Sequence, residues 1–333
     1  MCRAASFVVT KDKVYWSETS DSHEDIIKEF NLHEGSKINF VRAEIVPSGG
    51  DYRLPVRKWK FVVDQDIIPG WFDKKEQEVR CRKVLKDWYK AHVIKSGKHK
   101  LTGNISRVIL GGEVEIDGQS GGICQFFNNS KGAVSNQTGG HCRFFGSSEG
   151  TVSDQAVGIC KFYDNAKGTV SNQTGGYCEF NGSSKGTVSN QIGGNCEFFN
   201  YSKGAVSDQT GGHCRFYNNS KGTVSNQSGG IYQFFGSSKG TVSDQADGIC
   251  KFYDKSKGTV SKQKDGDCEF FSYSKGTVSN QSGGVCQFFN NSKGAVSNQT
   301  GGHCRFFGSS KGTVSNQKGG YCRFNDSSER VGV

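Results

Sequence analysis

The sequence predicts a mainly β protein, a β-solenoid of about 12–13 coils with 18 residues per coil, preceded by a small α+β domain. Cysteine recurs every 18 residues from Cys124 to Cys322, and the one missing rung carries Tyr232. Phenylalanine stands two residues after each rung in all twelve full units, from Phe126 to Phe324. A strict period of this length indicates one structural unit per repeat, stacked on its neighbours.

Each unit has room for two short strands. The stretches G-x-C-x-F-x and G-T-V-S-N-Q alternate between apolar and polar residues, and the Gly, Asn and Ser residues between them are turn formers. A triangular coil needs an aliphatic residue every six positions, but Cys, Ser and Asn stand there, so we favour a flattened coil with two sheets. We expect Cys, Phe and Val to point inward. The Ser six residues after the Cys and the Asn or Asp twelve after it should sit at corners and bond to the backbone or to one another.

Residues 1–103 are not repetitive and hold all four tryptophans, and residues 104–333 form the predicted solenoid domain. The alternation in Ser6–Thr10 and Val14–Ser17 predicts a hairpin. Asp21 or Ser22 can cap a helix over His23–Leu32.

The rest of this domain follows the same patterns. The residue patterns predict strands over Ile38–Val46 and Trp59–Val63, and a helix over Lys74–His92. We expect a polar, basic connector at Lys95–Thr102, and a degenerate first coil at Ser106–Ile123. The expected buried face of the long helix is formed by Val79, Val84, Leu85, Trp88 and Tyr89.

The cysteines predict packing rather than cross-linking. A disulfide framework spaces cysteines irregularly, whereas eleven of the 13 here lie on one ladder, outside which stand Cys2 and Cys81. We expect buried, reduced thiols, with pairing of adjacent rungs as the alternative in an oxidising setting. No run of 18 apolar residues occurs and the N-terminus lacks a signal-peptide core, so we expect no membrane partner and a cytoplasmic location. We expect neither a cofactor nor a metal site.

One outward position of the repeat is almost entirely lysine. A row of like charges is the pattern of a polyanion-binding stripe, for nucleic acid or another phosphate polymer, and also of a solubilising surface that blocks lateral sheet association. This lysine ladder comprises Lys131, Lys167, Lys185, Lys203, Lys221, Lys239, Lys257, Lys275, Lys293 and Lys311, with Glu149 and Glu329 on the two remaining rungs.

A second position is aromatic in ten of twelve units. Exposed, it would form an interface with a partner chain or a platform for bases; the alternative is packing over a coil corner. This aromatic strip comprises Phe127, Phe145, Tyr163, Phe199, Tyr217, Phe235, Tyr253, Phe271, Phe289 and Phe307.

A third surface is the Thr-x-Ser pair that flanks each inward valine, as in Thr169 and Ser171. A flat lattice of hydroxyl groups resembles the ice-binding face of solenoid antifreeze proteins. The match is interrupted by alanine at positions 133, 205 and 295.

The N-terminal region resembles a family of uncharacterised domains in tailed-phage proteins. Four segments and a short N-terminal motif carry the resemblance, which covers about the first 95 residues: Met1–Ala4, Ser22–Ile27, Phe40–Glu44, Trp59–Asp66 and Pro69–Asp73. The resemblance implies a phage or prophage gene with variable appended repeats, located in the host cytoplasm or in the virion. It implies no activity and no catalytic residues.

Together these features predict a non-enzymatic phage-type protein. Its solenoid would act as a structural, assembly or binding module through its repeated surface ladders. The expected partners are a second copy of the chain, as a homodimer, or another protein. The alternatives are a nucleic acid or other polyanion on the lysine ladder, and ice on the Thr-x-Ser face.

Overall fold

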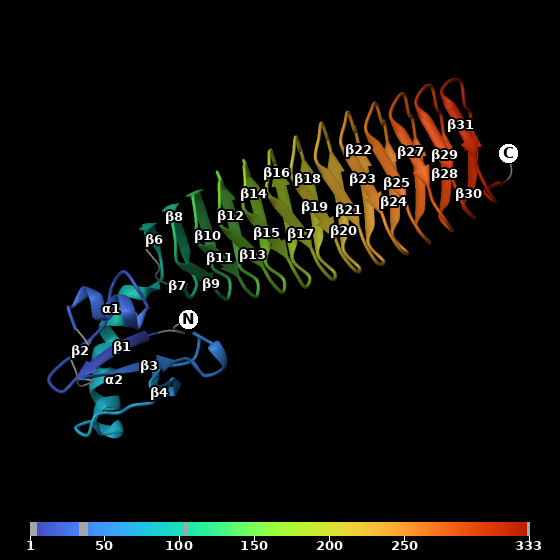
Figure 1. The fold of residues 1–333 in the computed structure, drawn as a ribbon. Helices are drawn as coiled ribbons and strands as arrows, with labels where there is room; N and C mark the ends of the chain where they lie inside the picture. Colours follow the sequence, from blue (N-terminus) through green and yellow to red (C-terminus); the bar gives the residue numbers. More distant parts are fainter. Residues whose placement is uncertain (1–4, 33–38, 103–105, 332–333) are drawn as a thin grey trace.

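The computed structural model describes residues 5–32, 39–102 and 106–331. A small domain lies at one end of a long solenoid, whose coils follow one another to the C-terminal end (Figure 1). This confirms the predicted mainly β class and the flattened, two-sheet solenoid of about 13 coils.

The N-terminal domain is a four-stranded antiparallel sheet with the order β2-β1-β3-β4 and two α-helices. The predicted hairpin, the two further strands and both helices are present. Ser22 caps the first helix by accepting a hydrogen bond from the backbone of Asp25. The elements are β1 (Ala5–Thr10), β2 (Val14–Tyr15), α1 (His23–Glu29), β3 (Phe40–Val46), β4 (Lys60–Val63) and α2 (Lys74–His92), with short 3-10 turns at Ser48–Gly50 and Val56–Lys58.

Helix α2 packs on the sheet through a face that the sequence identified only in part. Leu85 and Trp88 are buried as expected, and Val84 and Tyr89 are half-buried. Val79 is 55% exposed, which contradicts its place in the predicted buried face. Position 81 carries the core contact instead, because Cys81 lies one helical turn before Leu85 and is fully buried.

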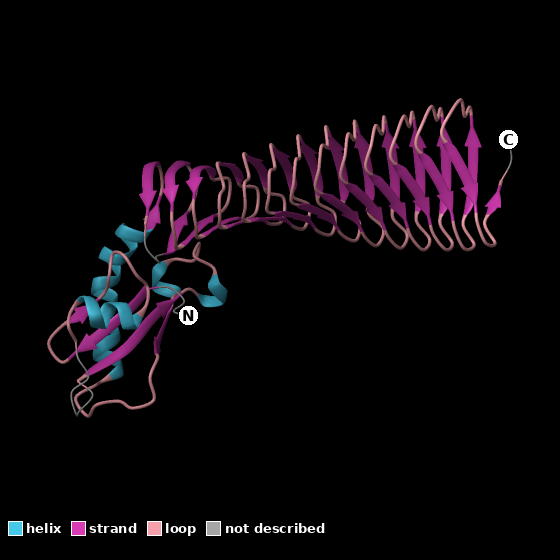
Figure 2. Ribbon diagram, turned by 45° about the horizontal axis from the view of Figure 1, so that its top comes forward, coloured by secondary structure: helices cyan, strands magenta, loops and turns pink. Residues whose placement is uncertain are grey.

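The solenoid consists of two parallel sheets of 14 strands each, in which each strand pairs with the corresponding strand of the next coil (Figure 2). The first, here called the cysteine sheet, contains β5 (Val93–Ile94), β7 (Ser106–Ile109), β9 (Ile123–Phe126), β11 (His141–Phe144), β13 (Ile159–Phe162), β15 (Tyr177–Phe180), β17 (Asn195–Phe198), β19 (His213–Phe216), β21 (Ile231–Phe234), β23 (Ile249–Phe252), β25 (Asp267–Phe270), β27 (Val285–Phe288), β29 (His303–Phe306) and β31 (Tyr321–Phe324). The second, the lysine sheet, contains β6 (Gly97–Leu101), β8 (Glu113–Gln119), β10 (Lys131–Gln137), β12 (Glu149–Ser153), β14 (Lys167–Ser171), β16 (Lys185–Ser189), β18 (Lys203–Ser207), β20 (Lys221–Ser225), β22 (Lys239–Ser243), β24 (Lys257–Ser261), β26 (Lys275–Ser279), β28 (Lys293–Ser297), β30 (Lys311–Ser315) and β32 (Glu329–Arg330).

The prediction of a connector at residues 95–102 is wrong, because Gly97–Leu101 is a strand of the lysine sheet. This segment lacks the repeat pattern, but it pairs with β8, which supplies its hydrogen-bonding partners. The preceding β5 pairs with β7. The N-terminal domain therefore covers the first coil directly, and its core includes Val93 and Val108 of those strands.

The solenoid core is a stack of phenylalanine rings. Neighbouring rings such as Phe216 and Phe234 lie parallel with centroids 4.7 Å apart, and each ring is fully buried. The glycine in the facing strand makes room for each ring, since a Cβ on Gly240 would overlap the ring of Phe234. Valine from the lysine sheet, such as Val242, completes the predicted inward set of Cys, Phe and Val.

The inward cysteines are hydrogen-bonded to a glutamine of the preceding coil, which the sequence did not reveal. The thiol of Cys160 donates to Oε1 of Gln137 over 3.0 Å, and Cys178 donates to Gln155 in the same way. The glutamines are fully buried, and their amide groups donate to glycine carbonyls at the corner, as Gln155 does to Gly158. Because this pairing spans 23 residues, it links successive coils across the core.

The two expected corner ladders had different outcomes. The Asn and Asp ladder is confirmed, since Asn172 donates to Asp154 over 3.0 Å and Asn190 donates to Asn172 over 3.1 Å. The prediction that the serine side chains form hydrogen bonds is wrong. From Ser130 to Ser310 its side chains are fully buried, and their hydroxyl groups have no partner among the described residues.

Tyr232 interrupts the cysteine ladder at a cost that can be measured. Its ring is fully buried, its hydroxyl has no partner among the described residues, and burial raises the pKa of its phenol. Oε1 of Gln209, which a cysteine at 232 would reach, is also without a partner in this part of the chain. Removing a buried, unpaired hydroxyl removes a desolvation penalty. We therefore expect Tyr232→Phe to raise the free energy of unfolding by about 1 kcal/mol, seen as a higher urea midpoint; a lower midpoint would contradict the missing hydrogen bond.

Candidate binding surfaces

The lysine ladder occupies the outer face of the lysine sheet, one residue per coil in register. Successive pairs from Lys185 to Lys293 lie directly opposite one another, as Lys221 and Lys239 do. Their side chains are exposed. Strands of a sheet are about 4.8 Å apart, so the charges form a straight row along the solenoid axis.

The ends of the lysine ladder are neutralised and its middle is not. Lys131 pairs with Glu113 at 3.2 Å, Lys167 pairs with Glu149 at 2.7 Å, and Lys311 pairs with Glu329 at 2.7 Å. The seven lysines from Lys185 to Lys293 form no ion pair with any residue that the structure describes. A single-sign stretch therefore remains on the central coils.

The cysteine sheet shows the opposite arrangement on its outer face. The residue after each cysteine is often charged, and at three places residues of opposite sign on neighbouring coils form an ion pair. Lys161 and Glu179 are 2.7 Å apart, Arg215 and Glu197 are 3.1 Å apart, and a further pair joins residues 251 and 269. The outer face of the cysteine sheet therefore carries charges of both signs, whereas the central rungs of the lysine ladder carry positive charge alone.

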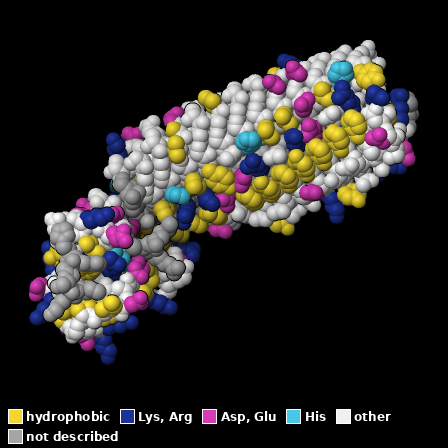
Figure 3. Space-filling view, viewed as in Figure 1, with side chains coloured by type: hydrophobic (Ala, Val, Ile, Leu, Met, Phe, Trp, Pro, Cys, Tyr) yellow, Lys and Arg dark blue, Asp and Glu magenta, His cyan; other side chains and the backbone are white. Residues whose placement is uncertain are grey.

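The aromatic strip lies at the corner that follows the strands of the cysteine sheet and is half-buried. Its rings form two stacks, the longer running from Phe199 to Phe307 with centroids 4.7–5.1 Å apart. Figure 3 shows a long hydrophobic stripe along this side of the solenoid, interrupted in its N-terminal part, with charged side chains beside it. Asn181 separates the longer stack from the shorter one. The shorter stack begins at Phe127, whose ring packs on Tyr52 of the N-terminal domain with the two ring centroids 6.3 Å apart.

The stacking decides what the aromatic strip can bind. Ring planes in the longer stack are within about 3–10° of parallel, so each inner ring covers the faces of its neighbours. Base stacking requires an exposed ring face. The strip therefore offers ring edges to a partner, which suits an apolar protein surface better than a nucleic acid base.

The Thr-x-Ser face shares the outer side of the lysine sheet. Threonines such as Thr223 and Thr241 are exposed and in register, and the serines two residues later are half-buried. The lysine ladder runs along the edge of this hydroxyl lattice on the same strands. These short side chains leave the lysine side chains unobstructed on the surface.

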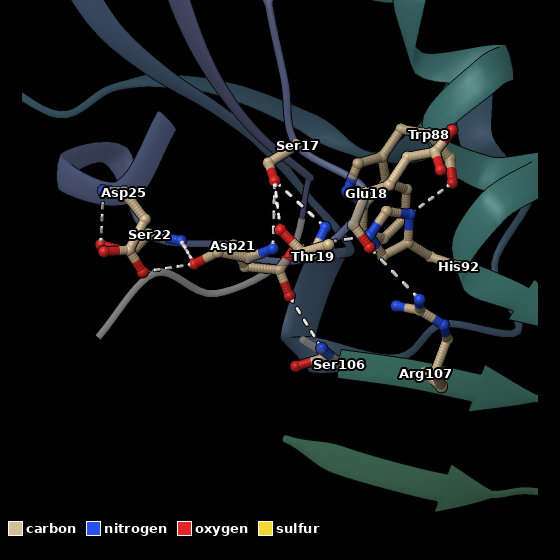
Figure 4. A network of polar contacts seen from close by, with 11 residues as sticks. Ser17, Glu18, Thr19, Asp21, Ser22, Asp25, Trp88, His92, Ser106 and Arg107 are labelled. Carbon is tan, nitrogen blue, oxygen red and sulfur yellow. Dashed lines mark hydrogen bonds and ion pairs between the residues drawn. The ribbon is translucent and has the colours of Figure 1, made fainter. Parts of the chain in front are cut away.

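A buried polar network joins the N-terminal domain to the solenoid (Figure 4). Asp21 accepts a hydrogen bond from the backbone N–H of Ser106 over 3.0 Å, and its other oxygen is 3.9 Å from Nε2 of His92. His92 stacks on Trp88 at 4.3 Å, and its Nδ1 is 2.7 Å from the Trp88 carbonyl oxygen. Burial raises the pKa of Asp21 to about 6 and lowers the pKa of His92 to about 4.

The network predicts a pH-dependent stability that Asp21→Asn should remove. Because burial raises the folded-state pKa above the ordinary 3.8, the Asp21 carboxyl stabilises the fold fully below about pH 4, and this contribution is lost as the pH rises through 6. We expect the free energy of unfolding of the wild type, relative to Asp21→Asn, to fall by on the order of 3 kcal/mol from about pH 4 to 7. Tryptophan fluorescence in urea reports it, because all four tryptophans lie in residues 1–103. If the difference in free energy of unfolding between the wild type and Asp21→Asn did not depend on pH over this range, Asp21 would be charged in both the folded and the unfolded state.

Comparison with protein-family models, with curated proteins and with solved structures gave no match. The resemblance of the first 95 residues to a tailed-phage domain stays a prediction. Neither helix in the described parts of the chain is long and apolar enough to cross a membrane.

Proposed function

We propose that the protein is a non-enzymatic binding module whose lysine ladder takes up a linear polyanion along the solenoid axis, with nucleic acid as the first candidate. The observation that carries this proposal is the row of seven consecutive lysines, Lys185 to Lys293, without an acidic partner in the described chain. Like charges one strand spacing apart repel each other, and the phosphates of a bound polymer relieve that repulsion, while the lysines release the counterions condensed on the polymer.

A purely solubilising role explains the ladder less well. Mixed charges keep a surface soluble without a large single-sign field, and the cysteine sheet of the same solenoid carries such mixed pairs at Lys161–Glu179 and Arg215–Glu197. The lysine sheet has the same repeat and the same opportunity, yet its central rungs contain lysine alone. The phage or prophage setting and the host cytoplasm belong to this proposal and rest on the resemblance and on the sequence.

Binding of a labelled mixed-sequence DNA duplex at different salt concentrations tests the proposal. If all seven unpaired lysines contact phosphates, a plot of log affinity against log salt concentration should have a slope of about −6. Between about 50 and 200 mM salt this is a loss of roughly 10³–10⁴ in affinity. Absence of binding at low salt, or binding that salt leaves unchanged, would reject the polyanion function.

Self-association through the aromatic strip is a second candidate, favoured by the half-exposed rings from Phe199 to Phe307. Two strips lying side by side would bury an apolar line on both chains and give a homodimer. Light scattering on the purified protein measures the mass directly. A dimer that becomes monomeric in Phe235→Lys, with DNA binding retained, would assign assembly to the strip; a wild-type monomer at all concentrations would reject it.

A further inference from the structure

A pocket of about 510 Å³ opens where the N-terminal domain meets the first coils. Its walls come from the loop before α1, from β3, from the residue after β4, and from the solenoid at Ser106 and Ile123. Acidic side chains predominate, since Asp21, Glu24, Asp25 and Asp64 line it against a single cation, Arg42. The field in this pocket favours a positively charged ligand.

Three donor groups lie close together beside this pocket, and two of them, His23 and Asp64, line it. One ligand atom each from His23, Glu44 and Asp64 lies within 4.8 Å of the other two. His23 Nδ1 and Asp64 Oδ2 are 3.4 Å apart. Ligand atoms about 2.1 Å from a common tetrahedral ion lie roughly 3.4 Å from each other, so this pair already has the separation of two ligands of one metal.

Glu44 supplies an independent reason to expect a cation. This residue is only 7% exposed, and its carboxylate forms no hydrogen bond or ion pair with any residue in the described ranges. Buried charges in proteins are paired or coordinate metals. The carboxylate lies beside His23 and Asp64, so a cation between these three groups would contact all of them.

The histidine is oriented as a metal ligand would be. Nε2 of His23 is 3.1 Å from the carbonyl oxygen of Ala43, which can only accept, so Nε2 carries a proton, and Nδ1 is the ring nitrogen that faces Asp64. Ligand histidines characteristically donate their other ring N–H to a carbonyl or carboxylate, which fixes the tautomer. The His23 side chain is 4% exposed, whereas Asp64 is 58% exposed and leaves the site open to the pocket.

We propose that His23, Glu44 and Asp64 bind one divalent first-row transition-metal ion at the junction of the two domains. One imidazole and two carboxylates form a donor set suited to Zn²⁺ and Mn²⁺, and the open side leaves positions for water. The three ligands come from α1, β3 and the residue after β4, so an ion would tie these elements together next to the first coil. The site is independent of the lysine ladder, which lies on the outer face of the lysine sheet.

Metal binding to the chelator-treated, full-length protein tests the site. Mn²⁺ is the primary probe, because it has little affinity for the thiols of the cysteine ladder, and loss of its free EPR signal measures binding. We expect one Mn²⁺ per chain, displaced by Zn²⁺, and a higher thermal midpoint when Zn²⁺ is added. Glu44→Gln and Asp64→Asn should each weaken Mn²⁺ binding at least about 10-fold.

The matched control is Asp66→Asn, which removes the same charge from an exposed position two residues from Asp64 and should bind Mn²⁺ as the wild type does. If the buried Glu44→Gln substitution unfolds the domain, the exposed Asp64→Asn variant still decides the test. Failure to bind Mn²⁺ or Zn²⁺, or equal binding by Asp64→Asn and the wild type, would overturn the proposal and leave His23 and Asp64 as an ion pair. Equal competition by Ca²⁺ would overturn the assignment to a transition metal.

Discussion

Replacing Lys221, Lys239 and Lys257 together by glutamine is expected to lower the affinity for duplex DNA about 100-fold at about 150 mM salt. The three residues are consecutive rungs in the unpaired part of the lysine ladder. Each phosphate contact adds about 0.9 to the dependence of log affinity on log salt, so the three contacts together account for a slope of nearly 3. The slope should therefore fall by about half, and the loss of affinity should shrink as the salt concentration rises.

The control for this variant changes the same net charge elsewhere. Lys74, Lys75 and Lys86 are exposed on helix α2, and their replacement by glutamine leaves the lysine ladder intact. If general attraction between a basic protein and DNA explained binding, the two triple variants would lose affinity equally. A loss confined to the ladder variant identifies the face that binds, and fluorescence anisotropy across a salt series measures both quantities.

The same comparison separates the two functions proposed for the solenoid. Glutamine at the three ladder positions leaves the aromatic strip untouched, because that strip follows the cysteine sheet and not the lysine sheet. A homodimer formed through the strip should therefore persist in the ladder variant. Loss of both DNA binding and dimerisation would instead indicate that the polymer bridges two chains.

Periodicity was sufficient to predict the solenoid and the direction of its main residues. Alternate residues of a strand face opposite sides, so once Cys124 points inward, Phe126 must do so as well, and the aromatic residue that follows must lie outside or at a corner. The same argument places Lys221 outward beside the inward Gly222 and Val224. These assignments depend only on neighbours in sequence.

The failures lie where a contact with another coil or domain decides the outcome. Gln137 points inward because Cys160, 23 residues later, donates to it and a glycine carbonyl accepts from it. No local pattern marks Gly97–Leu101 as a strand, because its partner β8 lies further along the chain. The donors at His23, Glu44 and Asp64 lie on separate elements of the N-terminal domain, and their spacing in sequence has no metal-binding signature.

Phe234→Ala is expected to lower the free energy of unfolding by about 3–5 kcal/mol, the largest stability effect that we predict for a single substitution. The ring is fully buried and stacks on Phe216 and Phe252, both at 4.7 Å. Its removal leaves a cavity and ends two stacking contacts at once. In a repeat array each coil is held by its neighbours, so the defect weakens the coupling between the two halves of the solenoid and should broaden the urea transition.

The adjacent Phe235→Ala is the matched control for this effect. It removes the same side chain from the half-buried aromatic strip, where Phe235 stacks on Tyr217 at 5.1 Å and on Tyr253 at 4.8 Å. We expect a loss of about 1–2 kcal/mol, because part of the ring is already in water. Equal losses for the two variants would contradict the assignment of one ring to the core and the other to the surface.

A second substitution at Gly240 tests whether the ring and the glycine form one packing unit. A Cβ at this position overlaps the Phe234 ring, so Gly240→Ala alone should be destabilising. In the Phe234→Leu background the smaller side chain leaves room for that methyl group, and Gly240→Ala should then cost less or be neutral. The two changes are thus expected to be non-additive, with a coupling energy of about 1–3 kcal/mol. Additive losses would mean that the glycine is required by the backbone of the lysine sheet and not by the ring above it.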